Sequence, residues 1–425
     1  MTGNPARSVV HKKRRFWNYE NRLVAIFAAG GAVYGLDALA LYFVMPFVKR
    51  DLHLDNAHVG MLSFAMLIGW AASGPLISAL SDKLGRRKPF LVGVYLMFAA
   101  VSALGAVAGV FATLLLSRLL MGLAEGPAIP IQQAIMVAES SPHRRAFNMG
   151  ITQNFGSQLF GALLGPLLMV QLAVTVGWRV AFVISGIPAL IVAIVIARFV
   201  REPANSNETV VGEGDGSFSI RELAKSRNVW LAALVGSAIA SWSTLLVTFL
   251  PLWSVQELHL SPRAMSVVMS VMGAGGVISA IIMPWLADRL GRRPVMILTA
   301  ALGAVAPLAA LSVGAPTAWV VFGVFAGSMA MAMYPLCCTV AVEAAPSRCA
   351  ALASAIVYAI STLVGGIIGP LAGGFLADRF GLATTLWISA AMAAAAAAVS
   401  AAIIAGPPSA RRRPRAEKEI LLTSA

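Results

Sequence analysis

The stretch DKLGRR (Asp82–Arg87) recurs 206 residues later as DRLGRR (Asp288–Arg293), and both copies stand between long apolar runs. Two other stretches recur at an offset of 204 residues: GALLGPL (Gly161–Leu167) as GGIIGPL (Gly365–Leu371), and Ala138–Ala146 as Val342–Ala350. Three matches at nearly one offset indicate an internal duplication in which each copy makes up about half of the chain.

Apolar runs dominate the rest of the sequence. Hydrophobic residues make up 59% of the chain and charged residues only 12%, which is typical of a membrane protein with many spans. The sequence therefore predicts an all-α membrane protein with twelve transmembrane helices in two six-helix bundles. The predicted spans lie near residues 23–48, 57–80, 89–109, 111–138, 146–172, 178–199, 228–253, 264–286, 294–313, 317–342, 350–374 and 382–405.

Polar segments mark the expected boundaries. A basic N-terminal tail (1–22) precedes the first bundle (23–200), and a linker (201–227) rich in Glu, Gly, Ser and Asn leads to the second bundle (228–405). A basic C-terminal tail (406–425) follows. Such a linker composition is typical of a flexible connection.

The Lys and Arg residues predict the orientation. Of 32 such residues, 26 fall in the tails and loops of one side. Because cytoplasmic loops carry the positive charge, we expect a multi-pass protein of the bacterial inner membrane with both termini in the cytoplasm. The net charge of +14 then indicates contact with anionic lipid headgroups rather than with nucleic acid. The outer side is left with Lys49, Arg50, Arg179, Arg263 and Arg379.

Two charges stand within the fourth predicted span. Arg118 and Glu125 share a helical face with Gly122, and their Cα atoms are separated by about 10 Å along the axis. Ionisable residues at membrane depth are costly and mark functional sites. Arg118 has two alternative roles: it binds a substrate carboxylate bidentately, through two parallel N–H donors, or it pairs with Glu125 when that residue is ionised.

A third ionisable residue, Asp37, lies near the middle of the first predicted span. Four of the five His residues fall outside the predicted spans, and the fifth, His58, stands at the very start of the second, so a proton carrier at the midplane must be a carboxyl group. Burial and neighbouring charge tune such a group to bind and release protons. We therefore expect Asp37 and Glu125 to couple proton movement. The equivalent region of the second half, 322–332, has no charge.

Polar and aromatic side chains at midplane depth are the remaining candidates for substrate binding, together with Arg118. Hydrogen bonding between helices is the alternative role for each of them. The candidates are Tyr34, Gln132, Gln133, Asn154, Gln158, Trp242, Tyr334 and Tyr358.

Other function classes lack support. No Walker-type phosphate loop is present, and no nucleophile–base pair or metal-ligand spacing stands out, so we expect neither an enzyme nor a bound cofactor or metal. The three cysteines (Cys337, Cys338 and Cys349) are too few and too clustered for a disulfide framework. The expected energy source is a proton gradient, and the expected state is a monomer.

The two Asp/Arg loops resemble the loop signature of the major facilitator superfamily, although Ser78 and Pro284 stand where a Gly usually begins the motif. The pattern Arg118-(x)3-Gly122-(x)2-Glu125 resembles the fourth helix of the anion:cation symporters. Tyr34–Asp37 resembles the first helix of the aromatic-acid:proton symporters. These resemblances imply uptake of a small organic anion with protons, by alternating access of the two bundles.

Several alternatives stay open. The Gly-Pro stretches of the fifth and eleventh spans resemble a motif of proton-driven exporters, so drug or metabolite antiport is the second hypothesis. An aromatic acid, a sugar acid and a dicarboxylate all remain possible substrates. The two loops are interpreted as a cytoplasmic gate, in which Asp82 or Asp288 pairs with Arg144 or Arg348 to hold the outward-open state. The gating residues are Asp82, Arg86, Arg144, Asp288, Arg292 and Arg348.

Overall fold

The structure is a computed structural model that describes residues 18–141, 144–152, 156–203, 226–345 and 349–403. The predicted tails lie wholly or largely outside these residues, as does most of the predicted linker.

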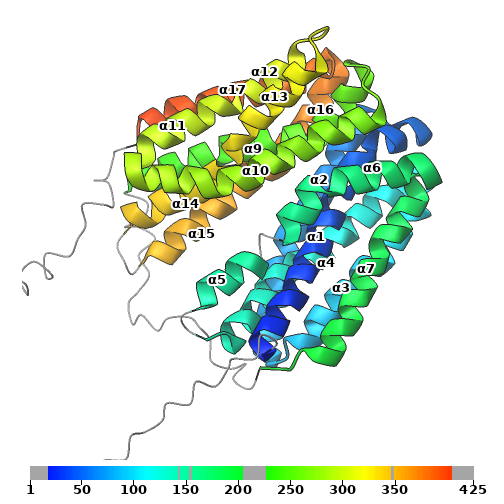
Figure 1. Cartoon of the computed structure of the whole chain (residues 1–425), viewed down its shortest axis with the longest axis vertical. Helices are drawn as coiled ribbons and strands as arrows, with labels where there is room; N and C mark the ends of the chain where they lie inside the picture. The colour runs from blue at the N-terminus through cyan, green and yellow to red at the C-terminus, as the bar shows by residue number, and fades with distance from the viewer. Residues whose placement is uncertain (1–17, 142–143, 153–155, 204–225, 346–348, 404–425) are drawn as a thin grey trace, which may run out of the picture.

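The first half of the chain forms helices with short connections (Figure 1). They are α1 (Tyr19–Asp51), α2 (Asn56–Leu84), α3 (Lys88–Ala106), α4 (Phe111–Glu139), α5 (Arg145–Gly150), η3 (Ser157–Leu163), α6 (Gly165–Val176) and α7 (Trp178–Phe199).

The second half repeats this arrangement. Its helices are α9 (Arg227–Gln256), α10 (Pro262–Leu290), α11 (Arg292–Gly303), α12 (Val305–Leu311), α13 (Thr317–Ser328), η4 (Met329–Ala332), α14 (Met333–Ala344), α15 (Ala350–Ile360), η6 (Ser361–Ile367), α16 (Ile368–Phe380) and α17 (Ala383–Ala401).

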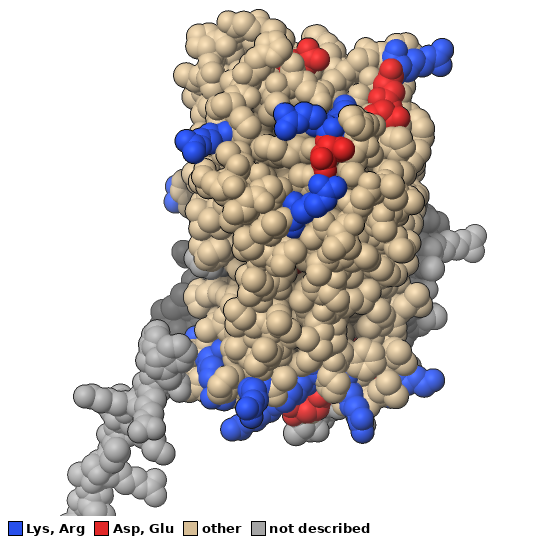
Figure 2. Space-filling model, turned by 90° about the vertical axis from the view of Figure 1, so that its right-hand side faces the viewer, with Lys and Arg blue, Asp and Glu red and all other residues tan. Residues whose placement is uncertain are grey.

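These helices confirm the predicted fold class. Among the described residues, eleven helices are long and apolar enough to cross a membrane, and η3 with α6 makes a twelfth span with a bend of 45°. Figure 2 shows charged side chains toward the two ends of one face and a belt free of them in between, as a lipid-facing surface requires.

The repeated loop signature ends a helix in both halves. Gly85 closes α2 with φ 62°, and Gly291 follows α10 with φ 95°. Only glycine adopts such left-handed backbone readily, so each copy of the signature carries its Gly at the turn. The chain then reverses at once into α3 or α11.

The two π-helical segments, η3 and η6, are 204 residues apart and are therefore equivalent in the two halves. Each stands just before a Gly-Pro pair of the repeated GxxxGP stretch. Proline lacks the backbone N–H that would bond four residues back, and π-helical turns occur often at functional sites. The duplication therefore preserved an irregular turn as well as the helices.

Glycines bring α4 against α2. A Cβ atom on Gly122 would lie 1.9 Å from the Met66 carbonyl oxygen, and one on Gly126 would lie 2.1 Å from the Ser73 Oγ. Both distances are below van der Waals contact, and the first neighbour is backbone that has little freedom to move. This close approach fixes the depth and direction of Glu125 on α4.

We expect Gly122→Ala to destabilise the folded protein strongly, because the two helices must separate to admit one methyl group. Overpacking of this kind typically costs about 1–3 kcal/mol. The matched control is Gly93→Ala, since a Cβ atom there meets nothing within 4 Å. Thermal unfolding of both variants in detergent measures the difference, and equal melting temperatures would contradict this account of α2–α4 packing.

The two halves meet closely at the end where α2 begins and α16 finishes. A Cβ atom on Gly60 would lie 2.5 Å from the Pro370 carbonyl oxygen. The Asp378 carboxylate accepts hydrogen bonds from the backbone N–H groups of Asn56 (2.8 Å) and Ala57 (2.7 Å) across the two halves. Toward the opposite end, where α5, α14 and α15 lie, the helices of the two halves diverge (Figure 1).

Candidate functional site

A cavity lies between the two halves. One part has a volume of about 390 Å³ and an adjoining part about 280 Å³. We call the two parts together the central cavity. The residues that line both parts are Leu39, Leu67, Ser243, Thr244, Val247 and Thr362.

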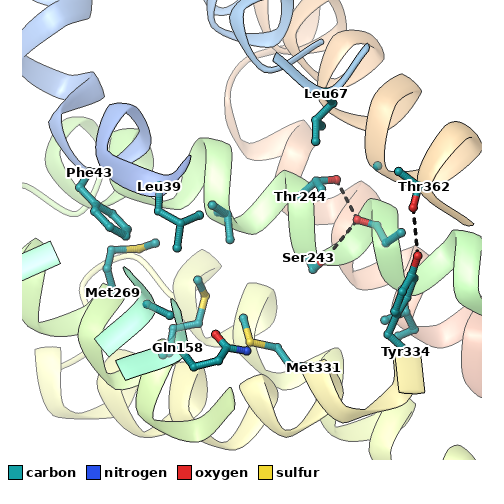
Figure 3. Close-up of a pocket in the computed structure, with 17 residues that line it drawn as sticks. Leu39, Phe43, Leu67, Gln158, Ser243, Thr244, Met269, Met331, Tyr334 and Thr362 are labelled. Atoms are coloured by element: carbon teal, nitrogen blue, oxygen red, sulfur yellow. Dashed lines mark hydrogen bonds between the residues drawn. The ribbon is translucent and has the colours of Figure 1, made fainter. Parts of the chain in front are cut away.

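Most of the lining is apolar, and most of its hydroxyl groups already have hydrogen-bond partners (Figure 3). Ser243 and Thr244 donate their hydroxyl groups to the Ala240 carbonyl oxygen, at 3.1 and 2.8 Å. The Tyr334 hydroxyl bonds Thr362 Oγ1 at 3.0 Å. The Gln158 amide lines the same space and has no hydrogen-bond partner among the described residues. Gln158 is therefore available to a substrate.

Glu125 is the charged residue of the central cavity. None of the other described residues that line it is Asp, Glu, Lys or Arg. The Glu125 side chain is only 1% exposed, and its Oε1 atom has no hydrogen-bond partner in the described part of the chain. Tyr34, Tyr42 and Trp70 line the same part of the cavity. The arrangement places one carboxyl group in an apolar, aromatic space between the halves.

Asp37 lies within the first half, away from the cavity lining. Its carboxyl oxygen Oδ1 accepts a hydrogen bond from Ser185 Oγ at 3.0 Å, and Ser102 Oγ lies 3.4 Å from both oxygens. Asp37 is 2% exposed. Helices α3 and α7 thus supply two hydroxyl donors to a carboxyl group on α1, which holds its orientation.

Arg118 is buried beside the two acids but bonds to neither. Its three guanidinium nitrogens have no hydrogen-bond partner among the described residues. The guanidinium carbon lies 5.3 Å from the centre of the Phe182 ring, within cation–π range. Asp37 and Glu125 are close enough for their charges to interact with it. Arg118 does not line the central cavity, and in this conformation it forms no ion pair with Glu125.

The structure places four of the predicted substrate-binding residues on the cavity wall: Tyr34, Gln158, Tyr334 and Tyr358. Tyr334 and Tyr358 stack edge to face, with their ring centres 5.2 Å apart. Asn154 lies outside the described residues.

Three other predicted binding residues do not line the central cavity in this structure. Trp242 is fully buried and donates its indole N–H to the Gly303 carbonyl oxygen at 2.8 Å. Gln132 donates to the Phe27 carbonyl oxygen at 3.1 Å and accepts from the Tyr95 hydroxyl. Gln133 lies within 3.4 Å of Thr152 Oγ1. All three side chains form hydrogen bonds to other helices or to the segments between them, which is the alternative role.

The predicted gate residues pair within their own halves. Asp82 pairs with Arg87 at 3.2 Å, and Arg144 pairs with Glu20 at 3.9 Å instead of with Asp82. Asp288 pairs with Arg292, its neighbour four residues on, at 2.7 Å. Among the described residues no ion pair joins the two halves at this end, where the halves diverge. Arg292 also pairs with Glu343 (3.2 Å), Arg86 is exposed, and Arg348 lies outside the described residues.

Trp70 and Thr362 are two of the cavity residues that were not predicted from the sequence. Trp70 lines the cavity from α2, but an aromatic residue in an apolar helix has no distinguishing pattern. Thr362 lines both parts of the cavity from η6. It stands 204 residues after Gln158, so the repeat offset was a usable signal. The two π-helical segments therefore present equivalent positions to the cavity from opposite halves.

Comparisons with known proteins agree with this architecture. The family description "Major Facilitator Superfamily" matches residues 27–285 and 237–424. The hexuronate transporter of Bacillus subtilis is 29% identical over 383 residues, which cover 84% of this chain and 88% of that protein. The 4-hydroxybenzoate transporter PcaK of Pseudomonas putida is 27% identical over 60% of this chain and 63% of its own length.

A solved structure shares the fold. It is a bacterial homologue of the human lysosomal transporter Spinster in an inward-facing and unoccupied conformation, with a TM-score of 0.76 and 18% identity. The match covers 91% of this chain and 97% of the other. The twelve spans, the duplicated halves with a cavity between them, and the family match over most of the sequence lead to one conclusion. The chain belongs to the major facilitator superfamily and is a secondary transporter.

Proposed function

We propose that this transporter takes up a small organic anion together with protons, by alternating access of its two halves. The observation that carries the proposal is Glu125, a buried carboxyl group on the wall of the cavity between the halves. A second buried carboxyl group, Asp37, and the unpaired Arg118 lie in the same half. The similarity to transporters named for hexuronate and 4-hydroxybenzoate supports an acid as the substrate.

The chemistry follows from the cavity. A carboxylate substrate and an ionised Glu125 repel each other in an apolar space, where charges interact strongly. A proton on Glu125 removes that repulsion and turns the group into a hydrogen-bond donor for the substrate carboxylate. Substrate and proton therefore favour each other's binding, and such coupling is reciprocal. Release of both on the other side resets the carrier.

The proposed site thus consists of a proton-coupling pair, Asp37 and Glu125, and of cavity residues that meet the substrate: Tyr34, Gln158, Tyr334 and Tyr358. For the orientation, the Lys and Arg distribution supports cytoplasmic termini in a bacterial inner membrane. In that orientation the closed end of the molecule faces outward, and the diverging end, with the charged loops, faces the cytoplasm.

Uptake into proteoliposomes tests the proposal. The purified protein is reconstituted, the outside is made acidic, and radiolabelled carboxylates of several classes are offered. At least one acid should accumulate above its outside concentration, and collapse of the gradient by a protonophore should abolish that accumulation. If every acid merely equilibrates, with or without the gradient, proton symport of an anion is wrong for this protein.

One observation favours a second candidate, proton-coupled efflux of a cationic or amphipathic compound. The central cavity has a single carboxyl group, largely apolar walls and no Lys or Arg among its described lining residues. A substrate cation would compete with the proton for Glu125. In the same vesicles, antiport predicts that a lipophilic cation dye added outside enters in exchange for internal protons, so that the vesicle lumen becomes more alkaline. It predicts no pH response to any carboxylate.

A further inference from the structure

A separate cavity of about 500 Å³ lies beside the central cavity, between α2 and α4 on one side and α15 and η6 on the other. We call it the side chamber. Its walls include Ala71, Gly74, Pro130, Ala359 and Leu363. The proposed function does not use this space.

The side chamber adjoins the central cavity directly. Trp70, Tyr358 and Thr362 line both spaces. The rings of Trp70 and Tyr358 are tilted by 41° with their centres 6.3 Å apart. On α4, Glu125 lines the central cavity and the next residue, Gly126, lines the side chamber. A molecule with its carboxyl group beside Glu125 therefore has its other end within reach of the chamber.

The chemistry of the chamber is almost wholly apolar. Apart from Ser78, Thr362, and the ring groups of Trp70 and Tyr358, its lining side chains carry no polar atoms. The Thr362 hydroxyl is already bonded to Tyr334. The Ser78 Oγ is buried and has no partner among the described residues. Ser78 lies eight residues after Trp70, which is about 12 Å along the helix axis.

This lining discriminates between the substrate classes that the sequence left open. A sugar acid carries a hydroxyl group on nearly every carbon, and each hydroxyl buried without a partner costs binding free energy. Besides the polar groups of the Trp70 and Tyr358 rings, the chamber provides the unpartnered Ser78 hydroxyl. The central cavity adds the Gln158 amide and the hydroxyl groups of Tyr34 and Tyr42, which are still fewer than the hydroxyl groups of a sugar acid in the chamber would need. An aromatic ring or an alkyl chain needs no such partners and gains from burial against Trp70 and Tyr358.

We propose that the substrate is an amphipathic monocarboxylate whose aromatic ring or alkyl chain occupies the side chamber while its carboxyl group stays in the central cavity beside Glu125. This inference rests on the proposed function and narrows it to one substrate class. The Ser78 hydroxyl forms one hydrogen bond, as donor or acceptor, with a single polar substituent near the far end of the ring or chain.

Filling the chamber tests the inference in the proteoliposome assay. Ala359→Phe places a ring in the chamber, and Ala71→Leu narrows it from the α2 side. The control is Ala372→Phe, an equally large change at an exposed position of α16 that lines neither space. The acids compared are a hydroxylated benzoate, a hexuronate, and acetate, which is too short to reach the chamber.

The ring acid should be accumulated by the unmodified protein. Both chamber variants should raise its KM by about tenfold, the scale on which a pocket rejects misfitting groups, while acetate uptake and the control variant stay unchanged. Uptake of the hexuronate without the ring acid, or an unchanged KM in a chamber variant that melts like the unmodified protein, would overturn the inference and leave proton symport standing. If no acid accumulates at all, the proposed function fails first, and this inference fails with it.

Discussion

Glu125→Gln is expected to abolish accumulation of substrate against its gradient, while downhill exchange of substrate across the membrane continues. The amide has nearly the shape of the protonated carboxyl group, so the substrate still finds a neutral, donating side chain. The amide binds and releases no proton, however, so the pH gradient no longer drives substrate accumulation. Accumulation ratios should fall from well above one to about one, because no free energy is then transferred from proton to substrate.

Asp37→Asn is expected to impair accumulation in the same way, for a related reason. The amide oxygen still accepts from Ser185 and Ser102, so the local structure is kept while the charge state is fixed. The electrostatic link of Asp37 to Arg118 is lost together with the charge. An exposed acid at the end of α9, Glu257, provides the control substitution Glu257→Gln.

The measurement is radiolabelled uptake with and without a pH gradient, followed by exchange against internal unlabelled substrate. Normal exchange with absent accumulation identifies a coupling residue and excludes simple misfolding. Should both variants still concentrate substrate in response to the gradient, neither carboxyl group carries the coupling proton. If only Glu125→Gln loses accumulation, Asp37 has the lesser task of orienting α1 against α3 and α7.

Most helix boundaries were predictable from the sequence, because the length of an apolar run and the turn residues beside it determine where a helix begins and ends without distant contacts. The span 178–199 agrees with α7 residue for residue, because Gly177 (φ 87°) ends α6 directly before it. The fifth span was predicted as one run, 146–172, but its described residues form α5, η3 and α6, with a bend of 45° between η3 and α6. The sequence contains the cause, Pro166, but hydropathy is uniform across it and does not reveal the bend.

The depth of the site residues in the membrane could be predicted from the sequence, but the direction in which their side chains point could not. Gln132, Gln158 and Trp242 all stand near midplane, yet only Gln158 faces the cavity. The rotation of each helix about its axis decides this, and rotation is set by close contacts such as those of Gly122 with Met66. In helices that are apolar on every side, no amphipathic stripe reports that rotation. In this conformation Asp82 and Arg144, both in the first half, pair with other neighbours, Arg87 and Glu20, and these partners could not be chosen from the sequence because local loop geometry decides them.

A second large effect, on the conformational equilibrium, is expected at the end of the molecule where α2 begins and α16 finishes. There Asp378 holds the two halves together. The stretch LADRFG (Leu376–Gly381) that contains it echoes LADRLG (Leu286–Gly291) of the loop signature. Its carboxylate accepts two backbone N–H groups at the start of α2, where the helix dipole also favours negative charge. Lys49 of α1 bonds Asn56 at the same place. The contact must break whenever this end opens.

Asp378→Asn should therefore shift the conformational equilibrium toward opening at this end. A hydrogen bond to a charged group contributes about 1.5–3 kcal/mol, which corresponds to a change of about tenfold or more in the ratio of closed to open molecules. Spin labels on His53 and Arg263, exposed positions of different halves near this end, report the ratio after the three native cysteines are replaced. Glu257→Gln serves as the control.

The expected result is a new population at longer label separation in Asp378→Asn and an unchanged distribution in the control. Its physical basis is that an amide oxygen accepts one of the two N–H groups weakly and offers no net charge to the start of α2. A faster return of the empty carrier should accompany the shift if opening at this end limits the cycle. An unchanged distance distribution in Asp378→Asn would show instead that the glycine contacts of Gly60 and Gly374 close this end without the carboxylate.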